Sequence, residues 1–272
     1  MGDLAQRVAT SVVGAALVVS VLRIGGAVFA ALIVVVALAA QYELYRMIRK
    51  TGARPLLGLG LAAGVGAVLW PVVPGVGLAL AGALLLLVPI VLWTRAETPI
   101  ADAAGTAYGV LYPSLLASSL VALRLTEAGW LTDLDAFWLT LTVLMSVWAA
   151  DSFAYIAGRL VGKTPLFERV SPKKTWEGAA GGLIGAAAFV AVFKLLVLDD
   201  VLGWNDVAVI AFAAGVLGPI GALTESLFKR SGGVKDSATW LPGHGGLLDR
   251  IDATLVAVPI VVLWFEVTRG VL

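Results

Sequence analysis

Residues 26–45 have the sequence GAVFAALIVVVALAAQYELY, and this stretch decides the class of fold. Residues 26–40 contain no charged side chain at all. A helix of about 20 mostly apolar residues is long enough to cross the hydrocarbon core of a bilayer. The stretch therefore predicts a helix that spans a membrane.

The composition of the whole chain agrees with that prediction. Hydrophobic residues make up 60% of the 272 residues and charged residues only 14%, with a mean hydropathy of +0.97. Soluble domains are about 45–50% apolar and about 25% charged, so this chain has too few polar side chains to cover a surface in water. Its apolar runs are continuous rather than alternating, which fits membrane strands poorly. We expect an all-α polytopic integral membrane protein.

The counts of charge, cysteine and histidine exclude several other classes. Lys and Arg number 19 against 18 Asp and Glu, so the chain has no excess of positive charge for binding nucleic acid. The absence of cysteine excludes disulfides, thiolate metal sites and cysteine nucleophiles. The single histidine, His244, excludes zinc sites built from several histidines.

The apolar pattern predicts about nine membrane-spanning helices. Their approximate ranges are 8–22, 26–45, 56–73, 76–93, 103–123, 136–158, 177–198, 207–228 and 247–268. The first range could also be a cleaved signal peptide, but Arg23 follows it without a convincing cleavage site, so we expect a retained helix.

The distribution of positive charge predicts the orientation and the localisation. With nine spans, most Lys and Arg residues fall on the side of the N-terminus, and the opposite side carries only Arg23, Arg124 and Arg269. The positive-inside rule places the first side in the cytoplasm, which predicts a multi-pass protein of the cell (inner) membrane. We expect residues 1–125 to form a scaffold of about five spans. Residues 126–272, with about four spans, hold most of the unusual polar residues and are expected to be catalytic.

The strongest functional signal is residues 226–252, SLFKRSGGVKDSATWLPGHGGLLDRID. The glycines and Pro242 predict a tight turn whose backbone can approach a ligand closely. Asp249 and Asp252 are three positions apart, so they share a face at the start of the last span. Mg²⁺ prefers one or two carboxylates together with substrate phosphates, and neighbouring Lys and Arg side chains suit phosphate oxygens. We interpret the segment as a metal and phosphate site rather than a solvated loop.

Two further segments carry polar groups. In the sixth span, Asp151, Tyr155 and Arg159 follow one another at intervals of four and share a helix face. A carboxylate at that depth indicates a functional site, with an internal ion pair to Arg159 or a lysine as the alternative. Residues 171–182, SPKKTWEGAAGG, form a loop and helix entry where two lysines, backbone N–H groups and the helix dipole could bind an anion. The alternative is a membrane anchor, and its glycines are explained by helix packing.

Together these residues resemble the signature of the phosphatidate cytidylyltransferase family, also called CDP-diacylglycerol synthases. The resemblance rests on a pattern with many fixed positions, namely Ser226, Lys229, Arg230, Lys235, Asp236, Pro242, Gly243, His244, Gly245, Gly246, Asp249, Arg250 and Asp252. Residues 171–178, the segment 151–159 and Glu43 after the second apolar run are similar to other parts of the family. The likeness covers essentially the whole chain, although the first 125 residues match mainly in pattern.

One position departs from the family. The family has an aspartate, similar in role to a metal ligand, where this chain has Ala222. An alanine cannot coordinate a metal, so either Glu225 contributes instead, or the site has fewer ligands, or the chain is impaired. We expect one Mg²⁺, and Ala222 makes a second ion such as K⁺ doubtful.

The resemblance implies that CTP and phosphatidate react to give CDP-diacylglycerol and pyrophosphate for phospholipid biosynthesis. It implies Asp249 as the Mg²⁺ ligand, with Asp252 or Asp151 as a further ligand. The groups expected to bind the phosphates of CTP and the lipid are Lys173, Lys174, Lys229, Arg230, Lys235, Arg250 and Arg159. Ser226, Asp236 and His244 are expected to position the substrates, with Gly245 and Gly246 close to them.

The resemblance also implies a homodimer among membrane lipids. Two other functions stay open on the residues alone. A CTP-dependent lipid kinase would release CDP instead of pyrophosphate. An ion-coupled transporter would instead show inverted repeats and charges near the middle of the membrane.

Overall fold

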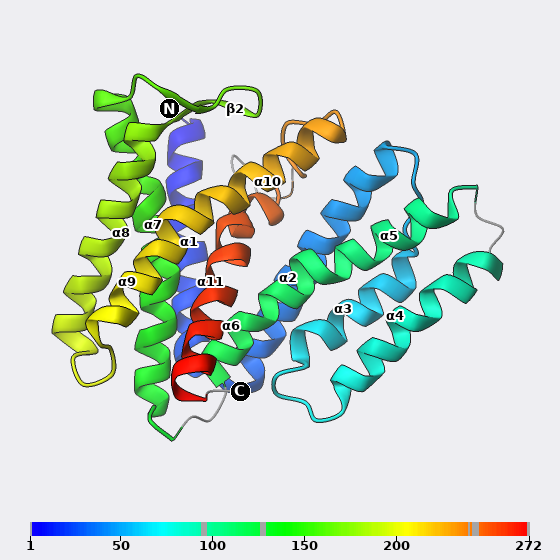
Figure 1. Cartoon of the computed structure of the whole chain (residues 1–272), viewed down its shortest axis with the longest axis horizontal. Helices are drawn as coiled ribbons and strands as arrows, with labels where there is room; N and C mark the ends of the chain where they lie inside the picture. The colour runs from blue at the N-terminus through cyan, green and yellow to red at the C-terminus, as the bar shows by residue number, and fades with distance from the viewer. Residues whose placement is uncertain (1, 94–96, 126–128, 239, 241–244, 271–272) are drawn as a thin grey trace. The chain divides into compact units, whose positions relative to one another are not determined.

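The computed structural model describes residues 2–93, 97–125, 129–238, 240 and 245–270 (Figure 1). Most of them are helical, which confirms the all-α class. The bounds of the elements are α1 Gly2–Ile24, α2 Gly26–Lys50, α3 Leu57–Leu69, α4 Val76–Trp93, α5 Pro99–Gly109, η1 Val110–Leu115, α6 Leu116–Leu125, α7 Asp133–Val161, β1 Pro165–Phe167, β2 Ser171–Thr175, α8 Trp176–Val197, α9 Trp204–Phe212, η2 Ala213–Leu217, α10 Gly218–Ser231 and α11 Leu248–Arg269.

Six helical segments in the described part of the chain are long and apolar enough to cross a membrane. They are Gly26–Lys50, Pro99–Leu125, Asp133–Val161, Trp176–Val197, Trp204–Ser231 and Leu248–Arg269. The other apolar helical stretches in the described residues are shorter, namely Val12–Ile24, Leu57–Leu69 and Val76–Val91, so the predicted count of nine spans is not confirmed. The helix α3 has 13 residues, and at 1.5 Å per residue it is about 20 Å long, less than the roughly 30 Å of a bilayer core.

The described residues form two compact units. The first unit contains Met1–Ala122 and Phe228–Arg250, and the second contains Leu123–Leu227 and Ile251–Leu272. The loop after α10 therefore packs with the N-terminal helices, although the sequence analysis grouped it with the C-terminal region. The predicted division into a scaffold and a catalytic region concerns function and stays a prediction.

In the first unit, a buried polar network fixes α2 against its neighbours. The amide of Gln41 donates hydrogen bonds to the hydroxyl of Tyr45 (2.8 Å) and to the carbonyl of Gly60 (2.7 Å). The hydroxyl of Ser114 donates to Gln41 (2.6 Å), and that of Tyr45 donates to the carbonyl of Thr106 (2.8 Å). Because buried polar groups are costly without partners, this network specifies how α2, α3, α5 and η1 pack. It holds the same helix that carries Glu43.

In the second unit, α7 and α8 pack along much of their length, and the hairpin β1–β2 connects them at one end (Figure 1). A Cβ atom at Gly178 or Gly182 would lie 2.9 Å from a carbonyl oxygen of α7, so only glycine allows this close approach. Helix packing thus accounts for these glycines, as predicted. The strands pair antiparallel, with Pro165 opposite Thr175. Residues 171–175, expected to be a loop, are therefore a strand.

Candidate functional site

The carboxylate of Asp249 is the most heavily hydrogen-bonded group of the predicted site. Asp249 lies in the first turn of α11, and its side chain is 6% exposed. Its Oδ2 atom accepts hydrogen bonds from the backbone N–H of Gly246 (2.8 Å), the backbone N–H of Ser237 (3.1 Å) and the hydroxyl of Ser237 (3.0 Å). These three donors fix the orientation of the carboxylate.

Lys229 occupies the other oxygen of the same carboxylate. Its Nζ atom lies 2.6 Å from Oδ1 of Asp249, and its side chain is 13% exposed. Lys229 lies in the last turn of α10, 20 residues before its partner in the chain. The loop between α10 and α11 therefore brings together a cation and a carboxylate that the sequence analysis singled out, and both are largely shielded from solvent.

Glu43 is a member of this site that the predicted set of site residues omitted. It is fully buried, and its carboxylate accepts hydrogen bonds from the hydroxyl of Ser237 (2.6 Å) and from the backbone N–H groups of Leu247 and Leu248 (2.9 Å each). The N–H groups at the start of a helix have no partner within the helix, so an acceptor there is stabilising. Glu43 thus holds the start of α11, which carries Asp249.

Ser237 links the two carboxylates, since its hydroxyl lies within hydrogen-bond distance of both. Ser237 is buried and was also absent from the predicted set. A serine in a loop carries no sequence signal of its own. Glu43 does carry one, because a carboxylate directly after a long apolar run is costly unless it has partners.

The glycines of the loop approach the protein's own carboxylates. A Cβ atom at Gly246 would overlap the hydroxyl of Ser237 and a carboxylate oxygen of Glu43. Gly245 has φ of +79°, a conformation that side chains disfavour, and a Cβ there would lie 2.7 Å from Oδ2 of Asp249. These glycines were predicted to lie close to a ligand, and in the structure their immediate neighbours are Glu43, Ser237 and Asp249.

The other predicted residues around this segment differ in their exposure and in their contacts. Arg230, Lys235, Asp236 and Arg250 have exposed side chains. His244, Pro242 and Gly243 lie outside the described residues. The hydroxyl of Ser226 donates to the carbonyl of Ala222 within α10 (2.8 Å). Glu225, the suggested substitute for the missing aspartate, is 1% exposed, and Asp252 accepts a hydrogen bond from the backbone N–H of Ala253 (2.8 Å).

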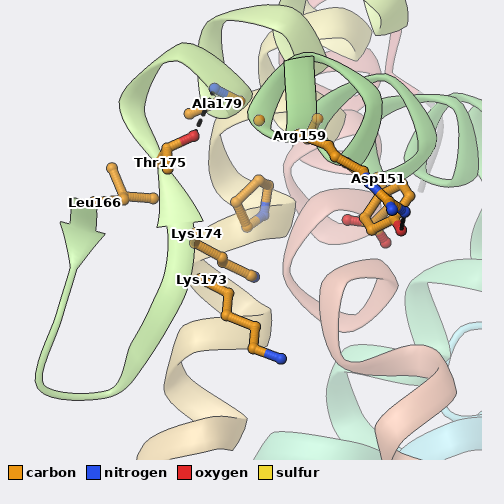
Figure 2. Close-up of a pocket in the computed structure, with 12 residues that line it drawn as sticks. Asp151, Arg159, Leu166, Lys173, Lys174, Thr175 and Ala179 are labelled. Carbon is orange, nitrogen blue, oxygen red and sulfur yellow. Dashed lines mark hydrogen bonds between the residues drawn. The ribbon is translucent and has the colours of Figure 1, made fainter. Parts of the chain in front are cut away.

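A pocket of about 340 Å³ lies in the second unit (Figure 2). Its polar lining includes Asp151, Tyr155 and Arg159 from α7 and Lys173 and Lys174 from β2. Figure 2 shows the two lysine side chains extending from the strand on the same side. The predicted face of α7 is therefore confirmed, since its three members line one pocket. The guanidinium of Arg159 donates to the hydroxyl of Tyr155 (2.8 Å).

Two backbone N–H groups at the start of α8 donate to other parts of the protein. The N–H of Trp176 donates to the carbonyl of Thr164 (3.0 Å), and that of Gly178 donates to the hydroxyl of Thr175 (3.1 Å). The carboxylate of Glu177 also lies at this helix start and accepts hydrogen bonds from Lys163 and Thr164. The protein itself thus occupies the N–H groups of Trp176 and Gly178, and anion binding by the neighbouring lysines stays a prediction.

The carboxylates fit a metal ion only in a limited way. Among the described residues, no three His, Asp or Glu side chains come together as a metal cluster. Oδ2 of Asp249 is occupied by three donors, and Oδ1 is the oxygen that contacts Lys229. Mg²⁺ commonly binds through one or two carboxylates and substrate phosphates. In the described structure both oxygens of this carboxylate thus have partners within the protein, so a Mg²⁺ ion could bind Oδ1 only where Lys229 moves away from it and phosphate oxygens supply further ligands.

Comparison with known proteins agrees with the sequence resemblance. A sequence model of the cytidylyltransferase family matches residues 5–268. A protein of Synechocystis named phosphatidate cytidylyltransferase is 33% identical over an alignment of 280 positions, which covers 94% of this chain and 94% of that protein. Proteins of the same name from Haemophilus influenzae and Thermotoga maritima are 46% and 39% identical, over 44% and 48% of this chain and 43% and 50% of their own lengths.

Proposed function

Because the chain belongs to the cytidylyltransferase family, we infer its reaction from its relatives: it transfers the cytidylyl group of CTP to phosphatidate. The products are CDP-diacylglycerol and pyrophosphate. The full-length similarity to a phosphatidate cytidylyltransferase carries this conclusion. No comparison supports the lipid kinase or the transporter considered from the sequence.

The chemistry of the substrates explains what the protein must supply. The phosphate monoester of phosphatidate has a second pKa near 6, as in phosphoserine, so it is largely ionised at neutral pH and is itself the nucleophile. One of its oxygens attacks the α-phosphorus of CTP, and the bond from that phosphorus to the β-phosphate oxygen breaks. No base is required. The difficulty is the approach of two anions, which positive charges must offset.

We propose that Lys229 and Asp249 form the nucleotide part of the active site. Lys229 would move from Oδ1 of Asp249 to the phosphate oxygens of CTP, and that carboxylate oxygen would then hold the accompanying Mg²⁺ ion. Bound Mg²⁺ would supply charge stabilisation and alignment of the phosphates. Glu43 and Ser237 keep the Asp249 carboxylate in one orientation through the hydrogen bonds described above. Arg230, Lys235 and Arg250, which are exposed around this pair, would add positive charge, and Asp236, Ser226 and His244 keep their predicted positioning roles.

Membrane placement follows from the same substrates. The long apolar helices make this a membrane protein, and a lipid substrate requires one. We propose that it lies in the cell membrane, with its cationic loops and active site facing the cytoplasm, because Lys and Arg concentrate on that side. The expected homodimer stays a prediction.

A direct assay tests this function. Purified protein in lipid micelles would receive α-labelled CTP, phosphatidate and Mg²⁺, and we expect labelled lipid and pyrophosphate in equal amounts. Release of CDP would indicate phosphoryl transfer instead. The variant Ala222→Asp belongs beside the unaltered chain. If only that variant forms labelled lipid, the family assignment holds and Ala222 has impaired this chain.

A further inference from the structure

The pocket of the second unit has a net charge that suits a phosphate monoester. Arg159, Lys173 and Lys174 are its cations, and Asp151 is its one acidic side chain among the described lining residues. The lining therefore has a formal net charge of +2. A phosphate monoester carries about −1.5 to −2 at neutral pH, which a net charge of +2 would offset. The pocket matches the monoester.

The walls of the pocket also suit an amphiphilic ligand. Leu166, Ala154, Ala179 and Pro219 supply apolar surface next to the three cations. Ligand sites usually combine such apolar walls with a few polar groups that fix orientation. A ligand with a charged head and an apolar body would satisfy both kinds of lining.

The helix α7, which contributes to the pocket, also has exposed apolar side chains. Trp148, Ile156 and Leu160 of α7 are 40%, 51% and 77% exposed. Trp148 lies seven positions before Tyr155 and therefore on the same helix face as this pocket residue. Because α7 is long and apolar enough to cross a membrane, acyl chains can lie against these side chains while the phosphate enters the pocket.

We propose that this pocket recognises the lipid phosphate, and that Arg159, Lys173 and Lys174 select a phosphate monoester over a phosphodiester. The phosphate of a diester such as phosphatidylglycerol has only one negative charge. It therefore balances the net charge of +2 in the pocket less completely than a monoester does. This inference rests on the proposed function, since it assigns some of the phosphate-binding cations to the lipid and the others to CTP. Lys229 and Asp249 serve the metal and nucleotide, and the second-unit pocket serves the lipid.

Equilibrium binding without CTP tests the inference directly. The full-length protein in detergent would be titrated with dioctanoyl phosphatidate and with dioctanoyl phosphatidylglycerol. We expect the monoester to bind at least about tenfold more tightly. In Lys173→Ala and Lys174→Ala, we expect phosphatidate binding to weaken by about tenfold, because each variant removes a charge-assisted contact. Equal affinity for the two lipids would overturn the proposal.

Two control variants distinguish binding in the pocket from a general attraction between surface cations and an anionic lipid. Lys163 and Arg169 are exposed cations of the same connection between α7 and α8 and do not line the pocket. Lys163→Ala and Arg169→Ala should leave phosphatidate binding within twofold. If they weaken it as much as Lys173→Ala does, the effect is a general surface attraction and the proposal is wrong.

Steady-state kinetics supply an independent readout. Lys173→Ala and Lys174→Ala should raise KM for phosphatidate about tenfold and leave KM for CTP within twofold. A rise confined to KM for CTP would make this a nucleotide pocket and refute the assignment. If the chain forms no CDP-lipid but its phosphatidate binding still depends on these lysines, the proposed reaction fails and the lipid pocket stands.

Discussion

The hydroxyl of Ser237 lies 2.6 Å from a carboxylate oxygen of Glu43, although 194 residues separate them in the chain. The same hydroxyl lies 3.0 Å from Oδ2 of Asp249. A glutamate of α2 is thereby connected to the carboxylate that we assign to the metal and nucleotide. The helix α2, which lies in the region expected to be a scaffold, thus contributes to the order of the proposed active site.

Removal of the charge on Glu43 should disturb both stability and activity. In Glu43→Gln, the amide keeps one acceptor oxygen, so one of the three donors around it loses its partner. A buried unsatisfied donor costs about 1–3 kcal/mol, which thermal unfolding in detergent would measure. Because Ser237 bonds to Glu43, the losses in Glu43→Gln and Ser237→Ala should be smaller in the double variant than their sum. Additive losses would show that the two side chains act independently.

Lys229→Met should abolish most of the turnover. The substitution keeps much of the side-chain length but removes the cation that we expect to bind CTP, and we expect a fall of at least about a hundredfold in kcat/KM, since each 1.4 kcal/mol of lost stabilisation is tenfold. It should also lower stability, because Asp249 would keep a shielded charge without this partner. Lys50→Met, at an exposed cation ending α2, is the control and should have normal kinetics. Near-normal turnover in Lys229→Met contradicts the assignment.

The metal dependence should run through Asp249. Treatment with a chelator should stop the reaction, and Mg²⁺ should restore it. In Asp249→Asn, binding of Mn²⁺ in the presence of CTP, followed by electron paramagnetic resonance, should weaken by at least about tenfold, because a neutral amide is a poorer ligand for a hard cation. Unchanged Mn²⁺ binding would move the metal site to other residues.

Gly246→Ala should fold poorly or lose activity, because its methyl group would overlap Ser237 and Glu43. Overpacking of this kind costs about 1–3 kcal/mol, measurable as a lower midpoint of thermal unfolding. Gly58→Ala, on an exposed position of α3 where a Cβ meets no atom within 4 Å, should be neutral or slightly stabilising. Equal stability of the two variants would mean that the loop can move away from the added methyl.

A cluster that includes the C-terminal end of α11, opposite the end that carries Asp249, should affect stability alone. Arg269 donates to Asp206, which also accepts from Trp264 (2.7 Å), and the guanidinium lies 4.2 Å from the ring centre of Trp130. Arg269→Met should lower the unfolding midpoint, because it leaves a largely buried carboxylate with one partner fewer. Both KM values should be unchanged in the protein that remains folded. A selective rise in one KM would connect this cluster to substrate binding.

The sequence was sufficient for the helical segments because each one is a local property. Every predicted span, such as 26–45 or 177–198, lies largely within a helix of the structure. The number of helices long enough to span a membrane was harder to predict. The apolar pattern of residues 56–73, for example, continues beyond Leu69, where α3 ends and a turn begins. Residues 171–175 were expected to be a loop, because five residues with two lysines carry no clear strand signal.

Within the candidate site, the sequence singled out Asp249, Lys229, Lys173 and Lys174 as candidates, because their residue types and spacing suit phosphates and a metal. It did not predict that Lys229 contacts Asp249, nor that Thr164 and Thr175 occupy the N–H groups at the start of α8. Those contacts depend on the path that a loop or strand takes in three dimensions. The spacing of residues along the sequence does not determine that path.

The amino-acid sequence by itself determined that this protein is a helical membrane protein of the cytidylyltransferase family. A run of apolar residues needs only its own length to match a bilayer, and a signature of fixed positions needs no partner elsewhere in the chain. Only the tertiary structure decided that Glu43 and Ser237 orient Asp249, and that Asp151, Arg159, Lys173 and Lys174 line one pocket. Such contacts depend on hydrogen bonds and packing between segments far apart along the chain, and their geometry exists only after those segments have packed.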